Sequence, residues 1–164
     1  MPSMLDQTMM LTPDGVRFVA IHPKVVETIR GWVERGSQSR EAGGILIGSY
    51  RGDHVEVSGS TVPMERDKRT RGLFDRMDRG HQEAAMQAWR SSGGTESYVG
   101  EWHTHPEAHP SPSVLDRWTW DRIMRRVREP VVFAIGGWDS CWWGIGAGAR
   151  VEVMRMLSSG WDIV

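Results

Sequence analysis

Hydrophobic and polar positions in the first third of the chain follow two different periods. Between Pro23 and Gly36, apolar residues recur every three or four positions, with a proline in the first turn and a glycine at the end. This spacing predicts an amphipathic helix. Two β-rich runs follow at residues 43–50 and 54–62, separated by a short turn with a central glycine. They predict a β-hairpin.

The apolar periodicity stops between residues 64 and 80, where arginine, lysine and acidic residues are dense. Such a stretch predicts an exposed loop or flap, followed by a helix from about Glu83 to Ser92. The abundance of basic residues suggests a binding role for the segment. A solvated loop without any partner explains the same composition.

The second half of the chain continues with a predicted strand over Ser97–His103, a proline-rich turn and a helix from Ser113 to about Arg128. Two or three strands close the sequence. Strands and helices are mixed rather than regularly alternating, which predicts an α/β fold of the mixed α+β kind, a mixed β-sheet sandwiched by helices. A length of 164 residues fits a single domain over residues 1–164.

Composition narrows the class of protein. With 20 Lys and Arg against 21 Asp and Glu, the net charge of −1 argues against nucleic acid or anionic lipid as the main partner. The apolar stretches are too short to span a membrane, and the N-terminus has no secretion signal pattern, so we expect a cytoplasmic protein. The single cysteine, Cys141, excludes an intramolecular disulfide and a multi-cysteine zinc site. Nine tryptophans favour core anchors over interface anchors.

The densest polar cluster lies between Gly100 and Asp116. His103 and His105 stand two residues apart at the end of the predicted strand, so their imidazoles face the same side. Pro106 ends the strand, and a short turn allows Asp116, in the first turn of the next helix, to face the same point. Two imidazoles and a carboxylate suit Zn²⁺ with its fourth position open to water.

Each part of this cluster has a simpler explanation. Ser113 and Asp116 form the Ser-x-x-Asp pattern of a helix capping box, which requires no metal. The two roles are compatible. A His-x-His pair also arises by chance, and only its coincidence with a proline-forced reversal and a reachable carboxylate favours a metal.

Two glutamates could move the proton of an attacking water molecule. Glu101 precedes His103 by two residues and should share its strand face. Glu41 precedes the first core strand, and the neighbouring Gly43 and Gly44 would let the backbone pass close to another element. Spacing alone does not decide between the two glutamates.

Taken together, these residues resemble the JAMM signature of the JAB/MPN/Mov34 metalloproteases. Glu41 precedes the run GGILIG, His103 and His105 are followed by a proline, and Ser113 stands three residues before Asp116. All five positions and their separations agree with the signature. The resemblance extends over about residues 17–155, and it is closest to short stand-alone prokaryotic members found beside ubiquitin-like conjugation enzymes in mobile and antiphage-defence operons.

The resemblance implies a JAB/MPN-like (cytidine-deaminase-like) fold and a role for each motif residue. One Zn²⁺ ion per chain would be bound by His103, His105 and Asp116. Glu41 would act as general base and acid, and Ser113 would donate a hydrogen bond to the water or the developing oxyanion. Glu101 would then be a carboxylate that orients an imidazole. His109, in the turn between the ligands, is more simply a solvated loop histidine.

The implied activity is that of a zinc metallo-isopeptidase. It would hydrolyse the amide bond after the C-terminal glycine of a ubiquitin-like protein, in a conjugate or a precursor, with E1- and E2-like conjugation enzymes as further partners. Residues expected to contact the modifier from the charged flap are Arg66, Lys68, Arg69, Arg71 and Phe74. The alternatives are a non-catalytic scaffold of the same fold, or the same hydrolase acting on a sulfur-carrier protein or small peptide.

Overall fold

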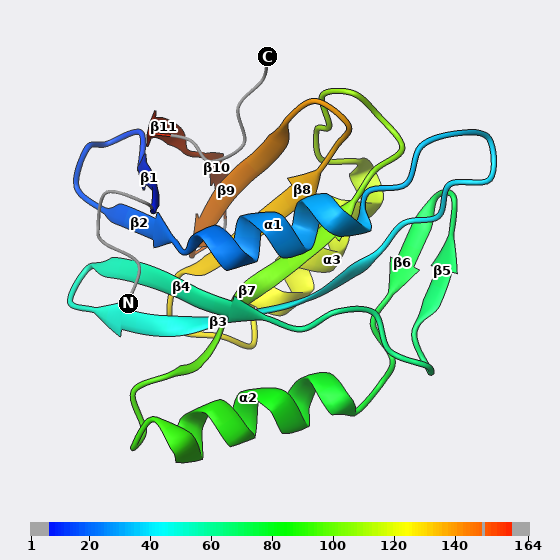
Figure 1. Cartoon of the computed structure of the whole chain (residues 1–164). Helices are drawn as coiled ribbons and strands as arrows, with labels where there is room; N and C mark the ends of the chain where they lie inside the picture. Colours follow the sequence, from blue (N-terminus) through cyan, green and yellow to red (C-terminus); the bar gives the residue numbers. More distant parts are fainter. Residues whose placement is uncertain (1–6, 149, 159–164) are drawn as a thin grey trace.

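The computed structural model describes residues 7–148 and 150–158, and its main element is one twisted sheet (Figure 1). Nine strands form it in the order β10-β9-β8-β7-β3-β4-β2-β1-β11. Their bounds are β1 Thr8–Leu11, β2 Phe18–Ile21, β3 Gly43–Arg51, β4 His54–Ser60, β7 Ser97–Thr104, β8 Val131–Gly136, β9 Cys141–Ala147, β10 Arg150–Val153 and β11 Arg155–Ser158. The remaining elements are α1 Pro23–Trp32, α2 Gly80–Ser91, α3 Val114–Met124, β5 Lys68–Thr70 and β6 Leu73–Asp75.

Strand β7 runs through the middle of this sheet. It pairs antiparallel with β3 and parallel with β8, so His103 has Gly43 on one side and Ile135 on the other. The sheet therefore contains both kinds of pairing. A residue at the end of β7 lies between two neighbouring strands, and backbone hydrogen bonds to them fix its position independently of its side-chain contacts.

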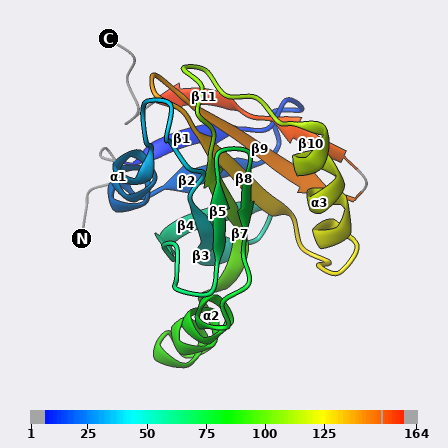
Figure 2. The same cartoon turned by 90° about the vertical axis from the view of Figure 1, so that its right-hand side faces the viewer.

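Helices cover both faces of the sheet (Figures 1 and 2). On one face, Val25 and Ile29 of α1 share a buried cluster with Trp102 of β7. On the other, Trp120 of α3 stacks on Phe133 of β8, with ring centroids 4.5 Å apart. Successive residues of β7 and β8 thus face different helices, as strand alternation requires. The predicted fold class, a mixed sheet sandwiched by helices, is confirmed.

Several boundaries differ from the sequence prediction. Helix α1 ends at Trp32 rather than Gly36, because Val33 has an extended backbone, and α3 ends at Met124 rather than near Arg128. The short strands β1 and β2 were not predicted. Each has only four residues, and they pair with β11 and β4, so remote contacts rather than a local pattern define them.

The charged segment of residues 64–80 is more ordered than the predicted loop. Its centre is the antiparallel hairpin β5–β6, and α2 begins at Gly80 rather than near Glu83. At the base of the hairpin, Asp67 accepts hydrogen bonds from three backbone N–H groups and contacts Nε2 of the fully buried His81 at 2.7 Å. His81 Nδ1 lies 2.6 Å from Thr61 Oγ1. This buried network fastens the hairpin and α2 to the sheet.

Burial of the tryptophans agrees in part with their expected core role. Trp102, Trp120 and Trp143 are buried, whereas Trp89 and Trp118 are more than half exposed. Cys141 is a buried free thiol, and burial raises its pKa. Over the part of the chain that the structure describes, no helix is long and apolar enough to cross a bilayer.

Candidate metal centre

Two imidazoles converge where β7 ends. His103 lies on β7 and His105 directly follows the strand, with its backbone N–H bonded to the carbonyl of Gly136 at 3.0 Å. The Nε2 atoms of the two histidines are 3.0 Å apart. His105 is 6% exposed. Both rings therefore present a nitrogen to one small, largely buried volume.

The carboxylate of Asp116 completes this group from the first turn of α3. Its two oxygens lie 3.1 Å from His103 Nε2 and 3.1 Å from His105 Nε2. Burial alone would raise the pKa of Asp116, but hydrogen bonds from the two imidazoles and from the N–H of Ser113 bring that pKa well below its usual range. Asp116 is therefore an anion that faces both rings.

Ser113 and Asp116 also form the capping box that the sequence suggests. The backbone N–H of Ser113 donates to Asp116 Oδ2 at 2.8 Å, and the backbone N–H of Asp116 donates to Ser113 Oγ at 3.0 Å. The same carboxylate thus caps α3 and contacts the imidazoles. The cap fixes the start of the helix and, with it, the direction of the carboxylate.

Glu41 approaches the histidines from the segment before β3. Its Oε1 lies 3.8 Å from His105 Nε2, and the residue is 7% exposed. Burial raises the pKa of Glu41, although the two imidazoles and a hydrogen bond from the backbone N–H of Phe74 oppose this effect. A buried carboxyl with a raised pKa is suited to accept and return a proton.

The β5–β6 hairpin holds Glu41 in place. The carbonyl of Thr70 accepts a hydrogen bond from the backbone N–H of Glu41 at 2.7 Å, and Arg69 Nε donates to the carbonyl of Glu41 at 2.9 Å. The Arg69 side chain is 13% exposed, ion-paired with Glu34 at 3.1 Å and placed over the ring of Trp32. Hairpin and glutamate therefore form one connected unit.

The residues expected to touch a modifier from this flap separate into two groups. Arg69 and Arg71 are bound within the chain instead, since Arg71 Nη1 donates to the carbonyl of Gly36 and to Ser39 Oγ. Arg66 and Lys68 are exposed. Phe74 packs against Gly43, where any side chain would collide with its ring and with the backbone of Trp102. Arg69 and Arg71 thus hold the hairpin against the residues around Gly36 and Glu41, and their contact with a modifier stays a prediction.

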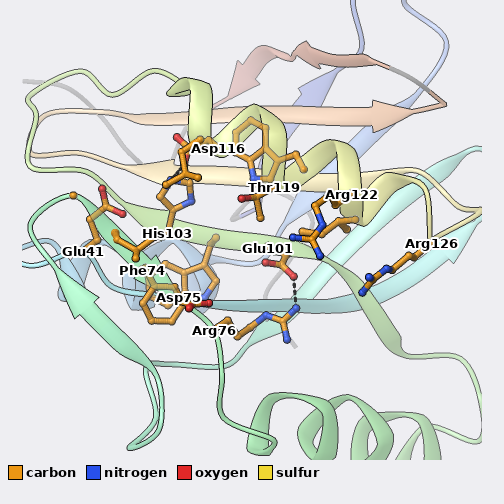
Figure 3. A pocket seen from close by; sticks show the side chains of 16 residues that line it. Glu41, Phe74, Asp75, Arg76, Glu101, His103, Asp116, Thr119, Arg122 and Arg126 are labelled. Carbon is orange, nitrogen blue, oxygen red and sulfur yellow. Dashed lines mark hydrogen bonds and ion pairs between the residues drawn. The ribbon is translucent and has the colours of Figure 1, made fainter.

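Glu101 and His109 have partners other than the metal residues. The Glu101 carboxylate is bonded to Arg76 Nη2 at 2.5 Å (Figure 3). It also accepts a hydrogen bond from the hydroxyl of Tyr98 at 3.2 Å. Neither partner is an imidazole, so these contacts do not support the expected orienting role of Glu101. His109 is exposed, and its Nδ1 contacts Ser140 Oγ at 3.0 Å.

The convergent residues fit a divalent metal ion. Glu41, His103 and His105 each offer a ligand atom, and these atoms lie within 4.8 Å of one another. The two Nε2 atoms face each other, and the anionic carboxylate lies beside both. A cation placed among these three groups would be attracted by the carboxylate. His105 Nδ1 is buried and has no hydrogen-bond partner within the described ranges. Nitrogen and carboxylate ligands of this kind suit zinc.

A groove of about 340 Å³ extends from this group of residues (Figure 3). Strand β6 forms one wall, α3 the other, and β7 the floor. The lining residues that were not singled out from the sequence include Arg76, Thr119, Arg122 and Arg126. Arg122 and Arg126 stand four residues apart in the predicted helix, which is the available sequence signal, but nothing in the spacing shows which side of the helix faces the groove.

Comparison with known proteins assigns the chain to a family. The profile of the prokaryotic homologs of the JAB domain matches residues 22–155, which include all the residues of the metal centre. The chain belongs to this prokaryotic JAB family. The resemblance drawn from the sequence motif is thereby confirmed.

Two curated relatives of this JAB protein have the same name. It is 46% identical over 114 residues to the CD-NTase/cGAS isopeptidase of Pseudomonas aeruginosa (strain BWHPSA011 / Pa011), which covers 68% of this chain and 72% of the relative. It is 31% identical over 156 residues to the CD-NTase/cGAS isopeptidase of Vibrio cholerae serotype O1 (strain ATCC 39315 / El Tor Inaba N16961), covering 95% and 99%. These matches support a hydrolase.

A solved structure shares the fold of this chain. The solution structure of protein DSY2949 from Desulfitobacterium hafniense superposes with a TM-score of 0.53 and 20% sequence identity. The superposition covers 79% of this chain and 82% of that protein. At this identity the likeness concerns the fold alone.

Proposed function

We propose that this JAB protein is a zinc-dependent isopeptidase that hydrolyses the amide bond after the C-terminal glycine of a ubiquitin-like protein. One observation carries the proposal: two imidazole Nε2 atoms, the Asp116 carboxylate and the buried Glu41 meet at the head of a groove. The relatives named CD-NTase/cGAS isopeptidase support a nucleotidyltransferase of that class as the conjugated target. E1- and E2-like enzymes would supply the conjugate in the cytoplasm of a bacterium that uses it in antiphage defence.

His103, His105 and Asp116 would hold the zinc ion. When bound, zinc supplies a Lewis acid that polarises the scissile carbonyl and makes a water molecule acidic near neutral pH. Two sets of contacts orient Asp116 as a ligand. Its carboxylate contacts both imidazoles, and the capping box fixes its backbone. The carboxylate thus needs little reorganisation to act as a ligand.

Glu41 would move the protons of the reaction. It would accept a proton from the attacking water and return it to the leaving amine, a use for which burial and a raised pKa suit it. The backbone N–H of Phe74 orients its carboxylate. Ser113 accepts a hydrogen bond from Asp116 N–H, and its own hydroxyl proton would be donated to the developing oxyanion.

The groove would hold the extended tail of the modifier. Within the described residues, β6 pairs only with β5, so its other edge is available to a peptide in the extended conformation. Backbone hydrogen bonds along β6 would fix the register of the tail. The scissile bond would then lie beside Glu41, which the N–H of Phe74 on the same strand already contacts.

Mass spectrometry of a ubiquitin-like protein with a C-terminal extension tests the proposal. We expect the zinc-loaded protein to cleave directly after the glycine and the chelator-treated protein to leave the extension intact. Glu41→Gln should retain zinc and lose turnover by about 100-fold to 10,000-fold. Glu83→Gln, an exposed glutamate on α2, serves as the matched control.

Two outcomes would contradict the assignment. Full turnover by the Glu41→Gln protein would remove the proposed proton carrier. Absence of stoichiometric zinc in the purified protein, measured by elemental mass spectrometry, would favour a non-catalytic scaffold of the same fold.

A further inference from the structure

The groove that leads from the metal residues has an uneven distribution of charge. On its floor, the Glu101 carboxylate is bonded to the Arg76 guanidinium, so these two charges compensate each other. The hairpin wall contributes one exposed carboxylate, Asp75. The α3 wall contributes two exposed arginines, Arg122 and Arg126. Beyond the metal centre, the groove therefore has a basic wall.

Both arginines are available to a ligand. Among the described residues neither forms an ion pair with a carboxylate, in contrast to Arg125 of the same segment, which pairs with Asp121 at 2.9 Å. Arg122 lies over the ring of Trp118, 4.9 Å from its centroid, which supports the guanidinium without neutralising it. Figure 3 shows Arg122 and Arg126 on the side of the groove opposite Arg76.

We infer that this groove selects a substrate tail with an acidic side chain about three to five residues before the scissile bond, bound by Arg122 and Arg126. The inference rests on the proposed function and names its substrate more closely. Along a helix each residue rises about 1.5 Å, so Arg122 is roughly 9 Å from Asp116 along the axis of α3. Arg126 lies in the turn that continues α3 after Met124, where its backbone N–H donates to the carbonyl of Ile123, and is roughly 15 Å away by the same rise. An extended tail advances about 3.3 Å per residue, which places the acidic residue in that window.

The acidic residue belongs to the tail rather than to the leaving side. In an isopeptide the leaving side begins with the methylenes of a lysine side chain, which present no carboxylate at a fixed distance. A tail in extended conformation along β6 does present side chains at fixed distances from the scissile bond, and alternate ones point to the α3 wall. Carboxylate binding by guanidinium groups is strong and directional, so two arginines suffice to discriminate between tails.

Fluorescence polarisation with labelled tail peptides tests the inference without requiring turnover. Peptides ending in glycine with glutamate, glutamine or arginine in the three-to-five window would be titrated against the zinc-loaded Glu41→Gln protein. We expect the glutamate peptide to bind about tenfold more tightly than the glutamine peptide, and the arginine peptide more weakly than both. Added salt should reduce this difference.

Variants identify the groups responsible. The double variant Arg122→Gln/Arg126→Gln should bind the glutamate and glutamine peptides equally, while its affinity for the glutamine peptide stays unchanged. Arg122→Glu/Arg126→Glu should prefer the arginine peptide. Arg117→Gln is the matched control, since this exposed arginine of α3 lines a different cavity. It should preserve the preference of the parent protein.

Equal binding of the three peptides, or tighter binding of the arginine peptide, would overturn the inference. The same peptides with an aminocoumarin after the glycine separate this result from a failure of the proposed function. Turnover by the zinc-loaded wild-type protein without charge preference would support the isopeptidase activity and contradict the preference for an acidic tail. Charge preference in binding without turnover would support the preference for an acidic tail and contradict the isopeptidase activity.

Discussion

Two of the places where histidine contacts carboxylate differ in character, one beneath α2 and one at the end of β7. Beneath α2, His81 is fully buried and both of its ring nitrogens have a partner, Asp67 on one side and Thr61 on the other. The Asp67 carboxylate also accepts hydrogen bonds from three backbone N–H groups. Every polar atom of this cluster is satisfied by the chain itself, which leaves no position for a ligand.

The cluster at the end of β7 has the opposite character. His103 and His105 direct Nε2 atoms at each other, Asp116 contacts both, and His105 Nδ1 is buried without a hydrogen-bond partner in the described part of the chain. The two clusters contain the same residue types and differ in how many ring nitrogens converge on one point. Only the cluster at the end of β7 is therefore a candidate metal centre within this pair.

Removal of one ligand should give the largest effect. In the proposed metal centre, His103→Ala loses a zinc ligand, so we expect zinc content to fall and turnover to drop by at least about 1,000-fold. Elemental mass spectrometry and the cleavage assay measure the two effects. His109→Ala, in the loop contacting Ser140, is the control and should change neither. A His103→Ala protein with full zinc content would contradict the comparison.

Removal of His81, in the cluster beneath α2, should affect stability instead. His81→Ala leaves the buried Asp67 without its side-chain partner and opens a cavity, so the free energy of unfolding should fall by about 2–4 kcal/mol. Zinc content and the specific activity of the folded protein should stay at wild-type values. Urea denaturation gives the first quantity. Loss of zinc from a folded His81→Ala protein would show that the two clusters are coupled.

An intermediate effect is expected where the hairpin fastens the proposed base. Arg69→Met removes the hydrogen bond to the Glu41 carbonyl and the ion pair with Glu34, so turnover should fall about tenfold with zinc content unchanged. Lys68→Met, an exposed residue on the same strand, is the control. If both variants have the same turnover, the hairpin has no positioning role.

The smallest effect concerns acid stability. Burial raises the pKa of Asp67, but hydrogen bonds from backbone N–H groups and from His81 outweigh it and lower that pKa below 3.8. A depressed carboxyl pKa contributes stability above pH 3.8, which is lost as the pH falls through the folded-state value. Asp67→Asn should therefore reduce the free energy of unfolding by about 1 kcal/mol at neutral pH. The difference should shrink below pH 3.8, and a constant difference in acid urea titrations would contradict this account.

Local sequence patterns account for much of the fold and for the candidate metal centre. The strand alternation that puts His103 and His105 on one side, and the capping box that places Asp116 at the start of α3, act over a few residues. Such short-range rules are visible in the sequence because spacing determines direction. The mixed sheet was predicted for the same reason, from runs long enough to show their period.

Tertiary structure decided what depends on residues remote in the sequence. Arg69 lies in a segment whose composition suggested a substrate-binding flap. Its side chain is nevertheless bound to Glu34 and Glu41, because β3 and the β5–β6 hairpin pack together. His81 finds Thr61 and Asp67 only when α2 docks on the sheet. Spacing determines the direction of a side chain along its own strand or helix, but its partners depend on which elements pack against it, and no local period encodes that choice.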